Sequence, residues 1–236
     1  MLIDFHTHLL PAIDDGSQIV EESLDMIEAS RLQNVRCIVA TPHFYADRTN
    51  LADFLHQRDK AYELLLSQHT QSEPKVLLGA EVTYFRGIGK AEGLEKLCIA
   101  GTNALLLEMP FTQCGKNELN APHRILNRGL VPIIAHIERY YPFQRDLTVF
   151  NEVLSQPVYL QVNAEALLSR RTRRFVFKLI ENGYKILLGT DCHNMNKRKP
   201  DIEAGRQIIM LAFGKDYLDA MDALGEELLK PALGGC

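Results

Sequence analysis

Two histidines near the start of the chain, His6 and His8, have the spacing of a pair of metal ligands. The apolar residues around them favour a short buried strand over residues 2–8. Because side chains alternate along a strand, the two imidazoles point to the same side and can bind one ion. Asp14 and Asp15 follow the strand and can supply oxygen ligands to the same region. Taken alone, the His-x-His pair is equally compatible with ordinary polar residues at a strand end.

The same arrangement recurs along the chain, because further apolar runs end in His, Asp or Glu. We expect strands over residues 2–8, 37–41, 75–79, 104–107, 131–135, 158–162 and 185–189. We expect helices over residues 19–32, 52–68, 118–127, 147–154, 164–182, 202–213 and 217–229. The Gly-rich segment 84–101 is expected to be irregular, with one helical turn around Leu94.

The order of these elements predicts the fold class. Strands that are almost entirely apolar are typical of a parallel sheet covered on both faces. Their alternation with helices indicates an α/β protein. A barrel is favoured over an open sheet, because the chain has no Gly-rich phosphate loop and carries polar residues at many strand ends. With no linker or repeat, we expect one domain over residues 1–236, a seven-stranded (β/α) barrel with its site at the carboxyl ends of the strands.

The polar residues at the strand exits form one candidate metal site. These are His6, His8, Asp15, His43, Glu81, Glu108, His136, Asp191 and His193. A buried group of four carboxylates would repel itself unless cations neutralised it. Nine donors exceed the four that a tetrahedral ion takes, so two or three ions with bridging carboxylates are expected. The nitrogen and oxygen donors suit Mn, Fe or Zn better than Cu(I). The remaining histidines, at positions 56, 69 and 123, are expected to have surface roles.

The composition excludes several classes of protein. The formal net charge of −4 gives no basic footprint for nucleic acid. No run approaches the ~20 apolar residues of a membrane span, and the first residues do not resemble a signal peptide. The five cysteines include no C-x-x-C pair, which argues against a zinc cage or a disulfide framework. We expect a cytoplasmic protein in a reducing compartment, and the sequence leaves a homo-oligomer open.

Several motifs together resemble one family. His6-x-His8, the Leu-Pro-x-x-Asp-Asp-Gly turn at 10–16, Thr-Pro-His at 41–43, Gly-Ala-Glu at 79–81, the His-Ile-Glu-Arg-Tyr run at 136–140 and Asp191-x-His193 are similar to the polymerase and histidinol phosphatase (PHP) superfamily. Within it, they most resemble the metal-dependent tyrosine phosphatases of capsule and exopolysaccharide clusters, the CpsB/YwqE type. The resemblance implies a distorted seven-stranded barrel with three metal ions, usually assigned as Mn²⁺.

The resemblance also implies a role for each residue. The first ion would be held by His6, His8, Glu81 and Asp191. The second ion would be held by Glu81, Glu108 and His136, with Glu81 bridging. The third ion would be held by Asp15, His43 and His193. Arg139 and Arg198 match the phosphate-binding arginines of the family, the latter by its spacing after Asp191-x-His193.

The expected activity is hydrolysis of a phosphomonoester by a metal-bridging hydroxide, with the two arginines clamping the phosphate oxygens. The resemblance implies a protein-tyrosine phosphatase whose partner is a tyrosine-phosphorylated bacterial autokinase of polysaccharide export. Two alternatives remain at this point. One is a small-molecule phosphatase, such as a histidinol phosphatase. The other is a non-catalytic regulator that keeps the metal site.

A competing motif is Cys192 with Arg198, which fits the C-x5-R pattern of cysteine-based tyrosine phosphatases. That chemistry needs a phosphate-cradling loop beside a thiolate of lowered pKa. The five intervening residues contain no glycine and include His193, which is already a candidate ligand. We therefore expect Cys192 to pack as a small apolar residue behind the metal site.

Overall fold

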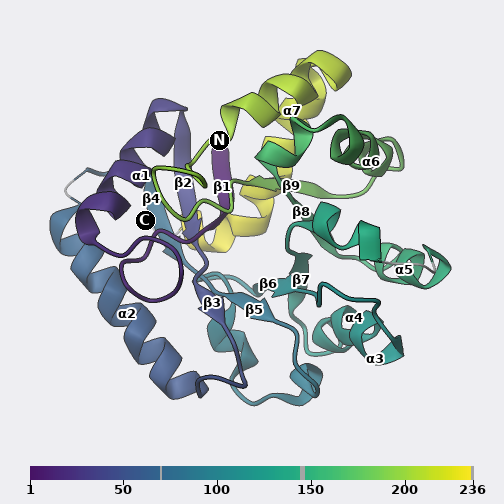
Figure 1. The fold of residues 1–236 in the computed structure, drawn as a ribbon, viewed down its shortest axis with the longest axis horizontal. Coiled ribbons are helices and arrows are strands. Elements are labelled where there is room, and N and C mark those ends of the chain that lie inside the picture. Colours follow the sequence, from purple (N-terminus) through teal and green to yellow (C-terminus); the bar gives the residue numbers. More distant parts are fainter. Residues whose placement is uncertain (70, 144–146, 235–236) are drawn as a thin grey trace.

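Parallel strands lie at the centre of the molecule and helices surround them (Figure 1). The computed structural model describes residues 1–69, 71–143 and 147–234. The strands are β1 Leu2–Thr7, β2 Val35–Ala40, β3 His43–Phe44, β4 Lys75–Leu78, β5 Glu81–Thr83, β6 Ala104–Glu108, β7 Val131–Ile134, β8 Tyr159–Asn163 and β9 Ile186–Gly189. The α-helices are α1 Val20–Leu32, α2 Leu51–Gln68, α3 Lys116–Leu119, α4 Ala121–Leu126, α5 Leu147–Leu154, α6 Arg170–Glu181 and α7 Glu203–Leu233. Short 3-10 helices are η1 Ile88–Lys90, η2 Leu94–Leu97, η3 Ile137–Arg139, η4 Tyr141–Phe143 and η5 Ala164–Leu167.

The strands form two parallel sheets rather than one closed barrel. Their orders are β1-β2-β4 and β3-β5-β6-β7-β8-β9. The α/β class with parallel strand pairs is therefore confirmed, whereas the pairing among the described strands does not close into the expected barrel of seven. An isolated parallel bridge between Thr7 and Cys192 connects the end of β1 to the segment after β9. Across it, His8 N–H donates to Cys192 O at 2.8 Å and Asp191 N–H donates to His6 O at 2.7 Å.

After each of the predicted strands 37–41 and 75–79, the chain breaks and then forms a short strand that was not predicted, β3 or β5, and both short strands belong to the second sheet. Thr41 and Pro42 separate β2 from β3, and Pro42 has no N–H to donate to a ladder. Gly79 and Ala80 separate β4 from β5 at the same level. The two breaks stay in contact, because Gly79 N–H donates to Ala40 O and Glu81 N–H donates to Pro42 O. Each strand therefore changes sheet just before it delivers a candidate ligand.

Four predicted helices differ in their details. The helix predicted over 118–127 is divided into α3 and α4, because Pro122 cannot donate the hydrogen bond that a continuous helix requires. The helix predicted over 164–182 begins as η5 and continues as α6. The last two predicted helices join as α7 across a kink at Gly214, whose φ is 83°. The helical turn expected around Leu94 is η2.

The core has two parts. A large cluster of buried apolar side chains fills the space between strands and helices. A smaller cluster draws on both sheets, including Ile3 and Phe5 of β1, Val39 of β2 and Leu106 of β6, and Leu229 of α7 is buried in it. In Figure 1 the end of α7 passes behind β1 and β2. We call the strand faces that line this smaller cluster the inner face of the strands. The C-terminal part of α7 packs against it.

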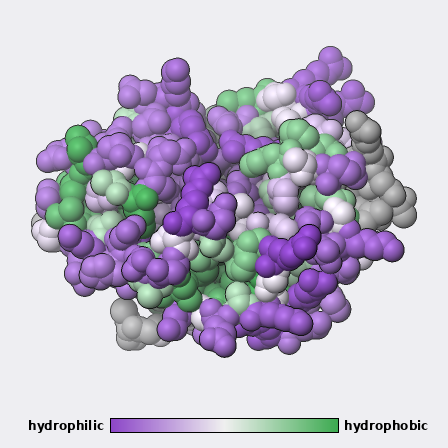
Figure 2. Space-filling view, turned by 60° about the horizontal axis from the view of Figure 1, so that its bottom comes forward, coloured by the Kyte–Doolittle hydropathy of each residue, from purple (hydrophilic) through white to green (hydrophobic). Residues whose placement is uncertain are grey.

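One face of the molecule is mainly polar. The face in Figure 2 is covered mostly by hydrophilic residues, with smaller hydrophobic areas between them. In the described part of the chain, no helix has both the length and the apolar character to cross a membrane.

Candidate metal centre

Strand β1 presents His6 and His8 together, as the spacing predicted. Their Nε2 atoms lie 3.0 Å apart. The Nδ1 atom of His6 is 2.9 Å from Gln161 Oε1, and the Nδ1 atom of His8 is 2.7 Å from Asp14 Oδ2. An N–H on each Nδ1 donates to these oxygens and leaves the Nε2 lone pairs facing each other, which is how ligating histidines are oriented in metal sites.

The Asp-Asp-Gly turn folds back onto the end of β1. Asp14 accepts hydrogen bonds from the N–H groups of Gly16 and His43, at 2.9 and 3.0 Å. A Cβ atom on Gly16 would lie 2.1 Å from His8 O, so only glycine fits this approach. Asp15 points the other way, and its Oδ1 lies 3.4 Å from the Nε2 atoms of both His43 and His193. The two neighbouring aspartates therefore have different roles, one orienting His8 and the other facing two histidines.

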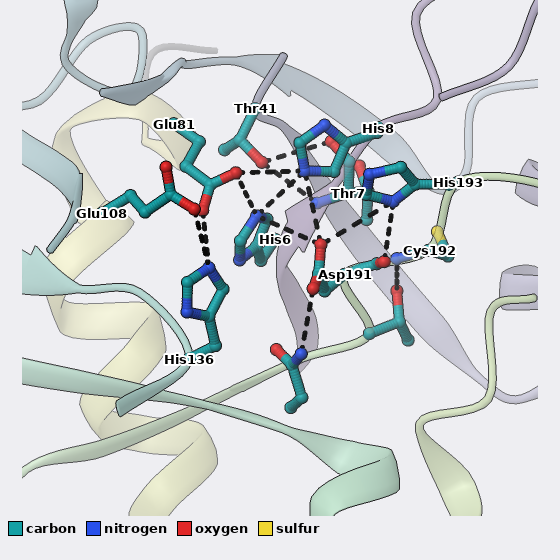
Figure 3. A network of polar contacts seen from close by, with 12 residues as sticks. His6, Thr7, His8, Thr41, Glu81, Glu108, His136, Asp191, Cys192 and His193 are labelled. Carbon is teal, nitrogen blue, oxygen red and sulfur yellow. Dashed lines mark hydrogen bonds and ion pairs between the residues drawn. The ribbon is translucent and has the colours of Figure 1, made fainter. Parts of the chain in front are cut away.

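Glu81 lies at the centre of the cluster (Figure 3). Its Oε2 is 3.2 Å from His6 Nε2, 3.4 Å from His8 Nε2 and 2.9 Å from His43 Nδ1. Its Oε1 is 2.8 Å from His136 Nε2. A carboxylate placed between four imidazoles has the position expected of a bridging ligand.

Glu108 and His136 complete one side of the cluster. Glu108 Oε1 lies 3.6 Å from His136 Nε2, and its Oε2 accepts a hydrogen bond from Thr83 Oγ1 at 2.6 Å. The backbone φ of His136 is 28°, a value that non-glycine residues rarely adopt. Its N–H donates to Gln161 Oε1 at 2.7 Å, so one amide supports both His136 and His6.

Asp191 and His193 complete the other side. Asp191 Oδ1 lies 3.6 Å from His6 Nε2 and 3.4 Å from His8 Nε2. Its Oδ2 accepts a hydrogen bond from the Asn163 side chain at 3.0 Å. His193 Nδ1 lies 2.9 Å from Asp191 O, which directs its Nε2 toward Asp15. Asp191 also has a positive φ, 54°, so two candidate ligands are held in strained conformations that cluster at functional sites.

All nine predicted ligand residues therefore lie in one cluster. Potential ligand atoms within 4.8 Å of one another form three groups: His8, Asp15, His43 and His193; His6, His8 and Glu81; and His43, Glu81 and Glu108. These groups overlap with the three sets that the resemblance implies but are not identical to them. The histidines at 56 and 123 are exposed and the one at 69 is partly exposed, all outside the cluster.

The electrostatics favour bound cations. Burial opposes ionisation of Glu81, but the surrounding histidines hold its pKa well below the usual value. Burial raises the pKa of Glu108, and the charge of Glu81 adds to this effect. Among the described residues, Glu81 Oε2, His43 Nδ1 and His193 Nε2 are buried atoms that make no hydrogen bond of good geometry, although Glu81 Oε2 and His43 Nδ1 lie only 2.9 Å apart. Buried polar atoms without a well-formed hydrogen bond are costly, and all three face the cluster, so these residues fit a metal site.

The two arginines lie at the rim of the cluster. Arg139 Nη2 is 3.0 Å from Asp191 Oδ2, and Arg198 Nη2 is 2.8 Å from Asp191 Oδ1. Both side chains are about one-third exposed, at 36% and 35%. Each guanidinium therefore contacts the candidate ligands on one side and solvent on the other.

Cys192 lies in the apolar core behind the cluster, as expected. It is buried, and burial raises the pKa of its thiol far above the ordinary value. A thiol in this environment stays protonated and is a poor nucleophile. The geometry gives no support to the cysteine-based mechanism.

Some supporting residues escaped the sequence analysis. Gln161 is a polar residue inside an otherwise apolar predicted strand, and this irregularity was its only signal. Asp4, also within a strand, accepts hydrogen bonds from the N–H and Oγ1 of Thr190, at 2.9 and 2.7 Å. Burial raises the pKa of Asp4 to about 6. These bonds join β1 to the end of β9, next to the strand segments that carry the histidines and Asp191.

The sequence also matches known proteins over nearly its whole length. A family model described as capsular polysaccharide synthesis, CpsB/CapC, covers residues 2–225. This chain belongs to the CpsB/CapC family. The resemblance inferred from the motifs is thereby confirmed.

Individual members of the CpsB/CapC family are moderately similar. The tyrosine-protein phosphatase CpsB of Streptococcus agalactiae is 28% identical over 233 residues, covering 91% of this chain and 92% of that protein. The tyrosine-protein phosphatase YwqE of Bacillus subtilis is 23% identical and covers 97% and 92%. A structure from a study of the metal-dependent tyrosine phosphatases YwqE of B. subtilis and CpsB of Streptococcus pneumoniae superposes with a TM-score of 0.83. It is 24% identical and covers 98% of this chain and 95% of that one, which shows a shared fold.

Proposed function

We propose that this protein is a metal-dependent phosphomonoesterase that acts on phosphotyrosine in proteins. The observation that carries the proposal is the single, mostly buried cluster of nine His, Asp and Glu residues with two arginines at its rim. Such a site can bind metal ions on its inner side and an anionic phosphate on its outer side. The tyrosine phosphatases of the same family are consistent with this substrate.

The proposed cofactor is Mn²⁺, in two or three ions, and Fe or Zn would also suit the donor set. We assign the ligands as the resemblance implies, with Glu81 shared between two ions. The buried atoms of Glu81, His43 and His193 that make no hydrogen bond of good geometry support this assignment. When bound, divalent ions lower the pKa of a bound water and offset the negative charge of the substrate.

The chain's own residues perform the remaining tasks. Arg139 and Arg198 bind the non-bridging phosphate oxygens, because guanidinium groups pair with phosphate in a planar, bidentate geometry. Asp14 and Gln161 fix the ring orientation of His8 and His6. A tyrosine leaving group has a pKa of about 10, far below that of an alkyl alcohol, so a strong general acid is less necessary.

The proposed physiological substrate is a tyrosine-phosphorylated bacterial kinase that functions in capsular or exopolysaccharide synthesis. The family description supports the pathway. We further propose that the protein acts in the cytoplasm, and the buried cysteines at 37, 98 and 192, which form no disulfide within the described residues, are compatible with a reducing compartment. We interpret the two sheets as one interrupted barrel within a single domain, because the inner apolar cluster draws on strands of both.

The proposal is tested by metal removal. Exhaustive chelation should abolish hydrolysis of both p-nitrophenyl phosphate and a phosphotyrosine peptide, and Mn²⁺ should restore it. Full activity in a sample verified as metal-free would refute the metal-dependent reaction. Histidinol phosphate should be a poor substrate for the Mn²⁺-loaded protein, and the reverse preference would identify a small-molecule phosphatase. No turnover of any of these esters, with metal bound, would indicate a regulator.

A further inference from the structure

Helix α6 carries an unusual concentration of positive charge. Its sequence begins Arg170-Arg171-Thr172-Arg173-Arg174, and Lys178 follows one turn later, in a chain whose net charge is −4. At 100° per residue, Arg170, Arg171, Arg174 and Lys178 project from one exposed face together with Phe175. Arg173 projects elsewhere, beside the buried face formed by Val176, Leu179 and Ile180.

This arrangement is unfavourable for the helix itself. Cations in a first turn oppose the helix dipole, and α6 has no acidic residue there. Like charges three or four residues apart, such as Arg170 with Arg174, also destabilise a helix. Elsewhere the chain uses these spacings for ion pairs, such as Glu28 with Arg31 and Lys215 with Asp219. Among the described residues, no carboxylate lies within 4.0 Å of a cation on the exposed face of α6.

These cations line a groove. It has a volume of about 580 Å³ and is bounded by Tyr141, Arg170, Arg171, Arg174, Phe175 and Lys178, which we call the basic groove. The rings of Tyr141 and Phe175 stack with centroids 4.3 Å apart and an interplanar angle of 23°. The groove thus combines a flat aromatic wall with several cations that have no carboxylate within 4.0 Å in the described part of the chain, a surface suited to an anionic chain with some apolar character.

The elements that line the basic groove lie next to one that carries a rim residue of the metal centre. Tyr141 belongs to η4, two residues after Arg139 of η3, and η3 packs against α6. Arg139 also lies 4.0 Å from Glu165, in the short segment that leads into α6. A polypeptide whose phosphotyrosine reaches Arg139 can therefore extend its neighbouring residues along η4 toward α6.

We propose that the basic groove binds an acidic segment of the same polypeptide that carries the phosphotyrosine. The groove would act as a specificity site, with its cations pairing with Asp, Glu or further phosphate groups beside the target tyrosine. This inference rests on the proposed phosphatase function and adds a substrate class to it. The groove lies next to η3, which carries Arg139 at the rim of the metal centre. This position favours a peptide, because a nucleic acid or a membrane surface would have no need to reach the metal centre.

The test compares two phosphotyrosine peptides, one with Asp and Glu around the phosphotyrosine and one with Ser and Gly there. The Mn²⁺-loaded wild type should have a lower KM for the acidic peptide, and added NaCl should remove this advantage. Arg171→Glu/Arg174→Glu should raise the KM for the acidic peptide by about tenfold, since charge-assisted contacts would become repulsive. The kcat for this peptide and the hydrolysis of p-nitrophenyl phosphate should stay within about twofold, because neither depends on contacts at the groove.

Arg173→Glu is the matched control, because it makes the same charge change on the same helix outside the groove. It should leave the preference for the acidic peptide intact. Thermal unfolding of the double variant should match or exceed the wild type, since acidic residues are favourable near a helix N-terminus. A second pair of peptides carries either a phosphate or a carboxylate group beside the target phosphotyrosine. Their KM values show which anion the groove prefers.

The outcomes separate the two proposals. Equal use of both peptides by the wild type, or equal losses in the groove and control variants, would overturn the basic groove while leaving the phosphatase assignment standing. Failure of the metal-loaded wild type to hydrolyse either peptide would overturn both. The binding of single-stranded DNA and of anionic phosphatidylserine vesicles is measured for the same variants. If the double variant loses binding to one of them but keeps the peptide preference of the wild type, the groove is reassigned to that partner and the proposal is refuted.

Discussion

Arg139 and Arg198 both contact Asp191 and are partly exposed at the same rim. We propose that both guanidinium groups bind the phosphate of the substrate. If Arg139 binds phosphate, Arg139→Ala should lower the rate on phosphotyrosine by ~10²–10³, as for loss of a donor aimed at the transition state. Bound metal should not change, because arginine has no free electron pair to donate. Arg139→Lys should restore the rate only in part. Steady-state kinetics with metal analysis check this.

Arg36→Ala is the control for Arg139, because Arg36 is also an arginine in an ion pair but lies on the exposed side of β2. It should have wild-type kinetics. A wild-type rate for Arg139→Ala would mean that this residue serves only to balance the charge of Asp191.

The two histidines of β1 should make metal binding depend on pH. Burial disfavours their charged forms, but Glu81, Asp191 and Asp14 outweigh it and raise the pKa of both rings above the ordinary 6.5. In the metal-free protein these rings therefore keep protons that a metal must displace. The affinity for Mn²⁺ should rise as the pH increases through the raised pKa values of these two rings, with proton release. Calorimetry in buffers of different ionisation enthalpy measures both quantities.

The partner of His8 gives this experiment a sharper form. Asp14→Asn removes the charge and the fixed ring orientation, and it should weaken metal binding by about 10–100-fold at neutral pH. The control, Asp25→Asn on the exposed face of α1, should bind metal normally. A pH-independent affinity in the wild type would contradict the assignment of His6 and His8 as ligands.

Cys192 is expected to be dispensable for the reaction. Cys192→Ser should keep most of the phosphatase activity, because the thiol is buried and its raised pKa keeps it protonated. The measurement is the specific activity of folded, metal-loaded protein. An inactive variant that is still folded and metal-loaded would bring back the cysteine mechanism.

At the scale of elements, the turn after β1 sets the position of two aspartates at once. Gly16→Ala would place a Cβ atom 2.1 Å from His8 O, so the turn must move away from β1. We expect a loss of ~1–3 kcal/mol in stability, typical of overpacking, together with weaker metal binding. Gly79→Ala, which meets its neighbours at 3.4 Å or more, should have a much smaller effect on both. Chemical denaturation and metal titration distinguish the two variants.

The sequence predicted the candidate ligands best where a His, Asp or Glu residue directly follows a predicted strand. His43, His136 and Asp191 each follow an apolar run, so their convergence could be predicted without knowing the connections. It could not separate Asp14 from Asp15, because neighbouring residues point in different directions and the turn decides which one meets His8. Gln161 was also out of reach, since its contact with His6 joins strands 155 residues apart.

The presence of most strands and helices could be predicted from the sequence, but the positions at which they break or join were harder to predict. The apolar runs at 37–41 and 75–79 gave β2 and β4, but the breaks at Pro42 and Gly79 that divide the sheet depend on each other through tertiary hydrogen bonds. Pro122 was a visible signal for the separation of α3 from α4. The break at Gly214 was predicted, because the helices expected over 202–213 and 217–229 are separated there, whereas their union into one α7 was not.

At the scale of the whole molecule, α7 stabilises the inner face of the strands. Leu229 is fully buried there, so Leu229→Ala should lower the free energy of unfolding by ~2–5 kcal/mol through lost burial and a cavity. Leu211→Ala, on the same helix but 83% exposed, should change it by less than ~0.5 kcal/mol. The kcat of the folded, metal-loaded fraction should be unchanged in both. A stable Leu229→Ala protein would show that α7 contributes little to the core.

The bridge between Thr7 and Cys192 joins the two ends of the ligand set, and this has a consequence for biosynthesis. His6 and His8 leave the ribosome early, whereas Asp191 and His193 follow some 185 residues later, a delay on the order of ten seconds or more at ordinary translation rates. During that interval the nascent chain exposes His6 and His8 without the carboxylate of Asp191, which completes their side of the metal site. The catalytic centre can therefore be completed only after most of the polypeptide has been synthesised, and such long-range closure is also intrinsically slow. Each newly made molecule would therefore gain activity abruptly and late, when the segment that carries Asp191 and His193 pairs with the end of β1.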